Sequence, residues 1–327
     1  TSGSYNVALG NDTNRVNTTG SNNVSIGHRA LFSNTTSDNV AVGHKALDAT
    51  TSGAKNTALG SEAGKTQSTG QDNTYIGYKA GHVSTADDNT FVGKESGLTN
   101  TTGARNTFIG KDAGYANTTG SDNTILGFDA GDAITTGGQN VCIGTSAGSA
   151  FTTVSHCVYI GKDSGQNATG NGNTGVGLDS LRGATGTSNT SLGRGAGEDL
   201  TSGGNNLILG AFAEASSATV SNEITLGDSS ITKFRIPGLS FTIDSTDISA
   251  ANNILPSANN SKNLGSSSLR WANLYVNDMH FSNEGKTGGN DIDGTTGNWT
   301  LQEGADHLYI INNKTGKRYK MGLQEVD

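Results

Sequence analysis

The chain has 327 residues, of which 48 are Gly, 15% are charged and only 2 are Pro. Its formal net charge is −8 and no basic stripe of the kind that a phosphate backbone requires is present, so we expect no nucleic-acid partner. No apolar run approaches the ~20 residues that span a bilayer, so we expect no membrane insertion. The 2 Cys suggest neither a disulfide framework nor a zinc site.

A five-residue phrase of Asn, Val or Thr, any residue, an aliphatic residue and Gly returns throughout residues 1–227. It reads NTALG at 56–60 and NTFIG at 106–110, and its Gly recurs 14 times at spacings of 16 or 17 residues. The residue four before the Gly is Asn in 12 copies, with Cys157 and Glu223 as the exceptions. A disordered, low-complexity chain does not keep phase over this length. The constant period predicts a solenoid in which each repeat forms one coil.

A repeat of this length fits one turn of a parallel β-solenoid or β-roll, and we expect two short strands and two turns per coil. The Gly would supply a backbone conformation that other residues avoid. The Asn would stack on the Asn of the neighbouring coils, as amides do in cross-β structures. Coils at the usual strand spacing would form a rod about 65–70 Å long.

Side chains alternate along a strand, so the positions one and three before the Gly share a face. Those positions are aliphatic or Val/Thr, as in Thr107 and Ile109, and we place them inside the coil. The position two before the Gly would then point outward, and its column of large residues predicts a subunit interface around a threefold axis. The interface residues that we predict are Tyr75, Phe91, Phe108, Ile125, Tyr159 and Ile208, with Trp271 at a later junction.

The phrase Asn, Val or Thr, any residue, aliphatic, Gly, two residues, Ala or Ser resembles the repeats in the heads of trimeric autotransporter adhesins. Similar repeats occur in the tail fibres of bacterial viruses. The resemblance covers about residues 1–227 and implies left-handed parallel β-rolls that trimerise side by side. The chain departs from the adhesin pattern in its longer period and in bulky residues where that family often has Ala.

After Gly227 the period stops. Residues 231–249 alternate like short strands broken at Pro237-Gly238. The stretch NLGSSSLRWANLYV (263–276) resembles an element near the C-terminal end of phage tail-fibre and tail-spike proteins. We therefore divide the chain into a rod (1–227), a β-rich transition (228–282) and a small β tip (283–327).

The last segment contains HLYIIN and KRYKMGL on either side of NKTG, which predicts a β-hairpin. It also concentrates aromatic and cationic side chains that the rod largely lacks, and such side chains supply much of the binding energy of small interfaces. The alternative is that the aromatic residues form the core of the tip and the Lys residues solvate it. The receptor-binding candidates are Trp299, His307, Tyr309, Lys314, Lys317, Arg318 and Tyr319.

We predict no catalytic residues, no metal site and no cofactor. His28 and His44 follow successive repeat Gly residues and should stack on adjacent coils, while Cys142 and Cys157 read as packing residues. The Gly-rich stretch at 193–199 lacks the Lys-Ser/Thr of a phosphate loop.

The acidic turn GGNDIDG (288–294) offers Asp291 and Asp293 as possible calcium ligands, although Asx-rich turns that bind nothing are commoner. No Ser/His/Asp grouping and no pair of carboxylates in an apolar setting stands out. We therefore expect a structural and binding protein and no enzyme.

These features together predict the distal part of a trimeric phage tail fibre, carried on the virion outside the cell. The tip or outer turns would contact a host cell-surface receptor, with a glycan as the expected class. A missing N-terminal part would join it to other tail proteins. The alternatives are the head of a bacterial trimeric adhesin on the cell surface, a glycan-cleaving tail spike and a purely structural virion decoration.

Overall fold

The computed structural model describes residues 2–150, 152–236, 278–283 and 294–322, together with 241–244, 248–250, Ser268, and Ile292. The chain divides into two compact units, Thr1–Thr232 and Lys233–Asp327. We call the first the rod unit and the second the C-terminal unit, and we describe each by itself.

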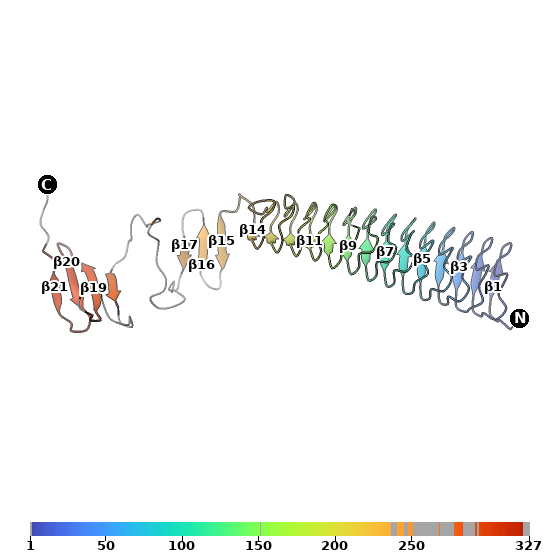
Figure 1. Cartoon of the computed structure of the whole chain (residues 1–327), viewed down its shortest axis with the longest axis horizontal. Coiled ribbons are helices and arrows are strands. Elements are labelled where there is room, and N and C mark those ends of the chain that lie inside the picture. Colours follow the sequence, from blue (N-terminus) through green and yellow to red (C-terminus); the bar gives the residue numbers. More distant parts are fainter. Residues whose placement is uncertain are drawn as a thin grey trace. The chain divides into compact units, whose positions relative to one another are not determined.

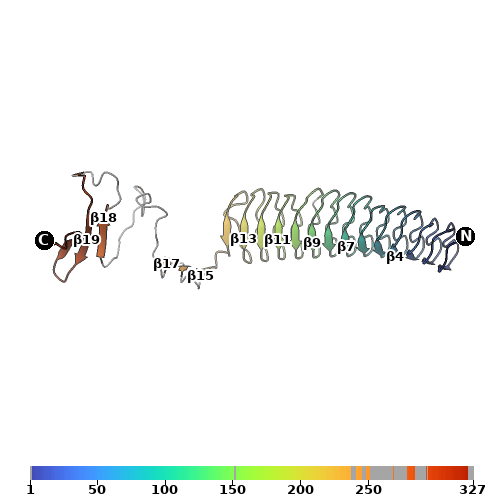
Figure 2. The same cartoon turned by 90° about the horizontal axis from the view of Figure 1, so that it is seen from below.

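The rod unit is a β-solenoid, as the repeat predicts. Each coil contributes one three-residue strand, and the 14 strands form a single parallel sheet in chain order (Figures 1 and 2). The expectation of two strands per coil is wrong, because turns make up the rest of each described coil. The strands are β1 (Val7–Leu9), β2 (Val24–Ile26), β3 (Val40–Val42), β4 (Thr57–Leu59), β5 (Thr74–Ile76), β6 (Thr90–Val92), β7 (Thr107–Ile109), β8 (Thr124–Leu126), β9 (Val141–Ile143), β10 (Val158–Ile160), β11 (Thr174–Val176), β12 (Thr190–Leu192), β13 (Leu207–Leu209) and β14 (Ile224–Leu226).

The repeat Gly marks a point where adjacent coils touch through their backbones. Gly110 has φ +140°, and a Cβ added to it would lie 2.2 Å from the carbonyl oxygen of Gly127 in the next coil. Its N–H donates to the Val92 carbonyl of the preceding coil at 2.8 Å. Any side chain here would push the coils apart, and this explains why the position is Gly in every copy.

The predicted Asn ladder is present and lies inside the rod. The Asn106 N–H donates to Asn89 Oδ1 at 3.0 Å, and Asn106 Oδ1 accepts from the Asn123 N–H at 2.9 Å. Asn106 Nδ2 donates to the Gly120 carbonyl at 2.8 Å. The amide therefore bonds mainly to the backbone of its neighbours, and it satisfies buried groups that water cannot reach.

The inside and outside of the strands are the reverse of our expectation. The residue two before the Gly points into the coil, together with the ladder Asn four before it, because alternate residues share a face. The residues one and three before the Gly point outward. The prediction that the large residues of this column line a subunit interface is wrong for Tyr75, Phe91, Phe108, Ile125, Tyr159 and Ile208, all of which are buried within one chain.

In most coils a large side chain fills the interior, and it comes from one of two positions. Where both positions are small, as at Ala58 and Gly64, side chains of the neighbouring coils such as Leu47 and Tyr75 fill the space. Where the strand supplies Phe108, the residue four after the repeat Gly is Gly114, and a Cβ there would lie 2.6 Å from the phenyl ring. Where the strand supplies only Ala41, the corresponding residue is Leu47, which is fully buried at φ 50°. The small residue at the third position, such as Ala113, is buried between the walls, as expected.

The described part of the C-terminal unit contains two antiparallel sheets. β15 (Lys233–Ile236), β16 (Phe241–Asp244) and β17 (Ile248–Ala250) form the first. The second contains β18 (Asp278–Ser282), β19 (Asn298–Glu303), β20 (Leu308–Asn312) and β21 (Arg318–Lys320) in that order. The hairpin predicted around NKTG is confirmed as β20–β21. The NLGSSSLRWANLYV element, including Trp271, lies outside the described residues apart from Ser268.

Removing one amide from the ladder should destabilise the rod. Asn106→Ala leaves the Asn123 N–H without its buried acceptor and removes one of two donors to the Gly120 carbonyl, which keeps Asn117 Nδ2 at 3.0 Å. We expect a loss of about 1–3 kcal/mol in the free energy of unfolding. Thr101→Ala is the matched control, since it removes a 2.9 Å bond from an exposed hydroxyl to the Thr118 carbonyl. Chemical unfolding followed by circular dichroism measures both, and equal losses would contradict a special role for the buried amide.

The two ways of filling the interior can be tested by converting the Phe108/Gly114 arrangement into the Ala41/Leu47 arrangement. Phe108→Ala alone leaves a cavity and should cost about 3–5 kcal/mol. Gly114→Leu alone drives a side chain into the Phe108 ring. The double variant reproduces the Ala41/Leu47 arrangement, so we expect it to be more stable than the sum of the single changes by about 2 kcal/mol. A double-mutant cycle of unfolding free energies measures this coupling, and strictly additive effects would refute the exchange.

Candidate binding surfaces

The outer face of the rod sheet is a half-exposed to exposed surface, rich in aliphatic side chains, that follows all 14 strands. We call it the outer sheet face, and it consists of the residues one and three before each repeat Gly. Leu59 is 49% exposed, Ile109 36% and Leu192 53%. The residue one before the repeat Gly is aliphatic in all 14 copies. The residue three before it is Val, Thr, Leu or Ile. A continuous apolar surface of this size is uncommon on a soluble monomer.

The β18–β21 sheet has two chemically different faces. Pairing places Phe281 opposite Trp299 and Leu301 opposite Ile310, so these side chains share one face, which we call the apolar face. The other face carries His280 and Arg318 and is mainly polar. Thr300 is the one buried residue among the described residues of the β18–β21 sheet. It bonds His280 Nδ1 at 2.8 Å and accepts from Asn313 Nδ2 at 2.9 Å.

The seven receptor-binding candidates do not form one site. Trp299 and Tyr319 lie on the apolar face with ring centroids 6.0 Å apart. Tyr309 lies on the opposite face, and its ring meets that of His307 edge-on at 6.4 Å. Arg318 shares that face with Tyr309.

The two remaining candidates, Lys314 and Lys317, lie in the hairpin turn and at its end. Lys314 lies in the turn, and its ammonium donates to the carbonyl and hydroxyl of Thr296 at 2.9 Å each. Lys317 is exposed where the turn meets β21. The structure therefore ties Lys314 to the fold and leaves two aromatic pairs on opposite faces as candidate contacts.

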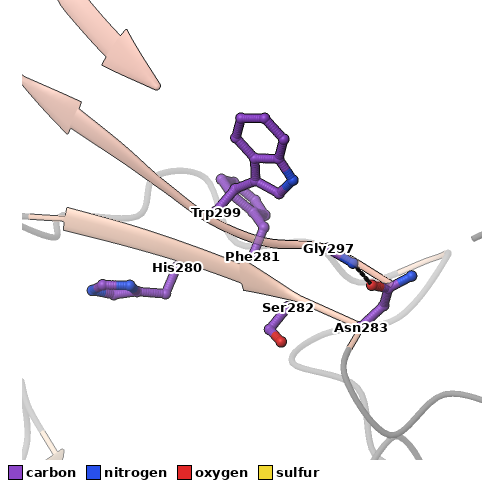
Figure 3. Close-up of a pocket in the computed structure, with 6 residues that line it drawn as sticks. All are labelled: His280, Phe281, Ser282, Asn283, Gly297 and Trp299. Atoms are coloured by element: carbon purple, nitrogen blue, oxygen red, sulfur yellow. Dashed lines mark hydrogen bonds between the residues drawn. The ribbon is translucent and has the colours of Figure 1, made fainter. Parts of the chain in front are cut away.

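An open pocket of about 490 Å³ lies where β18 meets the start of β19. Figure 3 shows Trp299 and Phe281 on the same side of these strands, with His280 and Ser282 on the other side. Asn283 continues from the end of β18 and accepts a hydrogen bond from the Gly297 N–H. Sequence reasoning singled out only Trp299 in this pocket. The alternation of Met279 and Phe281 with polar neighbours was the signal that could have found the rest.

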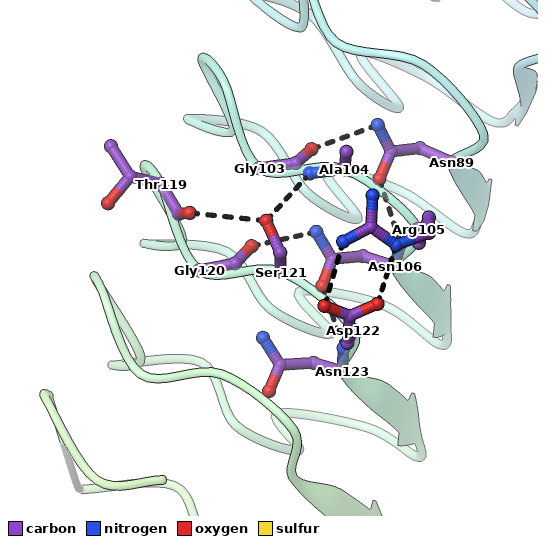
Figure 4. A network of polar contacts seen from close by, with 10 residues as sticks. All are labelled: Asn89, Gly103, Ala104, Arg105, Asn106, Thr119, Gly120, Ser121, Asp122 and Asn123. Carbon is purple, nitrogen blue, oxygen red and sulfur yellow. Dashed lines mark hydrogen bonds and ion pairs between the residues drawn. The ribbon is translucent and has the colours of Figure 1, made fainter.

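One edge of the rod, which we call the polar edge, carries Arg105, Ser121 and Asp122. Polar groups on this edge bond to those of the neighbouring coils. In Figure 4 the Arg105 guanidinium meets the Asp122 carboxylate of the next coil with two arms, at 2.7 and 3.0 Å. Hydrogen bonding to Arg105 holds the pKa of the Asp122 carboxyl below its usual range. Ser121 Oγ accepts from the Ala104 N–H at 3.1 Å. These contacts run from coil to coil, and they indicate a structural role for this edge.

The other candidates of the rod are structural as well. His28 and His44 stack with ring centroids 5.5 Å apart and an interplanar angle of 14°, as predicted. Cys142 and Cys157 are free and buried, and burial raises the pKa of both thiols, which makes them unreactive.

Among the described residues no three His, Cys, Asp or Glu side chains gather as a metal site would require. Asp291 and Asp293, the candidate calcium ligands, lie outside these residues. No helix in the described ranges is both long and apolar enough to cross a membrane. Comparison with protein-family models, with curated proteins and with solved structures finds no match.

Proposed function

We propose that this chain is the rod and tip of a trimeric viral tail fibre, most simply of a phage, that attaches the particle to a host cell surface. The observation that supports it best is the outer sheet face. A β-solenoid already buries its core within one chain, so an additional apolar surface along its whole length calls for a second function. Association with copies of the same chain is that function in this proposal.

The dimensions of the outer sheet face suit such an association. Fourteen strands at the usual spacing, each three residues wide, give a strip of roughly 65 by 10 Å, on the order of 650 Å². Stable interfaces bury about 800 Å² on each partner. The flanking turns would contribute the difference. The strip repeats the same two columns of side chains in every coil, so copies related by a closed symmetry axis can align it in register.

A threefold arrangement gives the fibre stiffness and reach. Three rods whose outer sheet faces meet at one axis would cover the apolar strips and leave the polar edges, such as Arg105 with Asp122, in water. Three C-terminal units would then be presented together. Their avidity for a repeated surface receptor would exceed the affinity of one unit.

The head of a bacterial adhesin is the main alternative, because it shares the rod. The observation against it is the C-terminal unit, whose described residues form antiparallel sheets where an adhesin would continue into a coiled coil. A glycan-cleaving spike is tested by incubating the protein with host polysaccharide and measuring the length of the products. A spacer without a receptor predicts no binding of the full chain to host cells.

The association is tested by the mass of the protein in solution. We expect three copies of the 33.3 kDa chain, about 100 kDa, by sedimentation equilibrium. Ile109→Glu combined with Leu126→Glu places buried charges in the interface. The double change should raise the protein concentration at which the trimer dissociates by at least about tenfold. Tyr115→Glu, in an exposed turn of the same part of the rod, is the control and should leave the mass unchanged. A monomeric unaltered chain would overturn the proposal.

A further inference from the structure

We propose that the pocket between β18 and β19 binds a neutral saccharide. This inference rests on the proposed attachment function and gives that function a ligand class and a position. The pocket has a volume of about 490 Å³, within the range that small-ligand sites occupy. It is lined by His280, Phe281, Ser282, Asn283, Gly297 and Trp299.

Two aromatic rings supply the apolar part of the site. Phe281 and Trp299 are cross-strand partners, and both side chains stand on the same side of the sheet (Figure 3). Phe281 is 51% exposed and Trp299 is half-buried, so their rings remain accessible. A pyranose ring has one face made largely of C–H groups, which packs flat on an aromatic ring.

Hydrogen-bonding groups line the same pocket as the rings. The Asn283 amide is held in place, because its Oδ1 accepts from the Gly297 N–H and its Nδ2 donates to the Thr295 carbonyl at 3.2 Å. One Nδ2 hydrogen and one Oδ1 lone pair remain for a ligand. The Trp299 indole N–H has no hydrogen-bond partner among the described residues and is a further donor.

Gly297 allows the indole to lie close to the backbone. A Cβ added to this residue would lie 2.9 Å from Trp299 Nε1 and 3.8 Å from Asn283 Oδ1. The absence of a side chain therefore sets the position of both the aromatic and the amide group. Gly297→Ala should displace the indole. It should leave the backbone unchanged, because Gly297 has a backbone conformation that Ala also adopts.

The charge of the residues that line the pocket indicates the class of ligand. None of the six described lining residues is Asp, Glu, Lys or Arg, so these residues include no permanently charged partner for a carboxylate or phosphate. A second pocket of about 310 Å³ includes Tyr309, Arg318 and Glu303 and is therefore charged. The uncharged aromatic and amide lining of the first pocket fits a neutral sugar better than an acidic one.

Trp299 reports directly on this site. The chain has 2 Trp, so Trp271→Phe in the full chain leaves Trp299 as the single indole. We would titrate it with lactose and maltotriose and compare lactose with sialyllactose, which adds one carboxylate. We expect a saturable change in emission at millimolar neutral sugar, with sialyllactose binding no tighter than lactose. Calorimetry on the unaltered chain checks that Trp271→Phe has no effect of its own.

Matched variants on the two sheet faces test the position. Phe281→Leu keeps an apolar side chain but removes the flat ring, and it should weaken binding about tenfold. Lys320→Leu changes an exposed side chain on the opposite face and should leave binding unchanged. Gly297→Ala should weaken binding and shift the emission of the unliganded protein.

Three results would overturn the inference: no saturable response to a neutral sugar, equal affinity in Phe281→Leu, or a tenfold preference for sialyllactose. A chain that fails this titration but still forms trimers and binds host cells refutes the pocket alone. A chain that binds lactose here but neither associates nor attaches to cells refutes the proposed function alone.

Discussion

The fold of the rod depends on the close approach of successive backbones. Adjacent coils stack at the spacing of hydrogen-bonded strands, and at Gly110 this leaves no room even for a Cβ. Every other feature follows from that spacing. The interior is one side chain thick, so the coils must fill it in turn, and the ladder amides such as Asn106 must satisfy backbone groups that the stack removes from water. No coil can do this alone, because a ladder Asn such as Asn106 bonds to the coil before it through its backbone N–H and to the coil after it through its side-chain amide.

The same constraint produces the outer sheet face. A three-residue strand offers one central side chain and two flanking ones, and alternation sends the central residue inward with the ladder Asn. The flanking residues, such as Thr107 and Ile109, must then face outward. Their β-branched and aliphatic character suits strand formation, yet it leaves an apolar strip in contact with water. Association through this strip would remove that cost, and this is the physical argument for the proposed trimer.

The repeat, the parallel solenoid, the ladder, the His28–His44 stack and the terminal hairpin could be predicted from the sequence, because each depends on local period or turn chemistry. The direction of the strand faces was wrong, although two signals were present. First, the Asn four before the repeat Gly and the residue two before it lie on the same face of the strand. Second, a coil with a large residue such as Phe108 has Gly114 four after the repeat Gly, whereas the coil with Ala41 has Leu47 there. The C-terminal site was harder to predict. Antiparallel pairing of β18 with β19 brings Phe281, Asn283 and Gly297 to Trp299. No sequence repeat predicts the register of that pairing.

The two units divide the physical tasks in a way that their sequences reflect. In the rod, polar groups bond to their own neighbours, as Arg105 does to Asp122, so this edge has little left to offer a ligand. In the β18–β21 sheet almost nothing is buried, and aromatic rings and amides stay accessible. A shallow site of this kind would bind a single sugar weakly. In the proposed trimer several copies would compensate for weak single contacts, because once one copy is bound the others search a small volume.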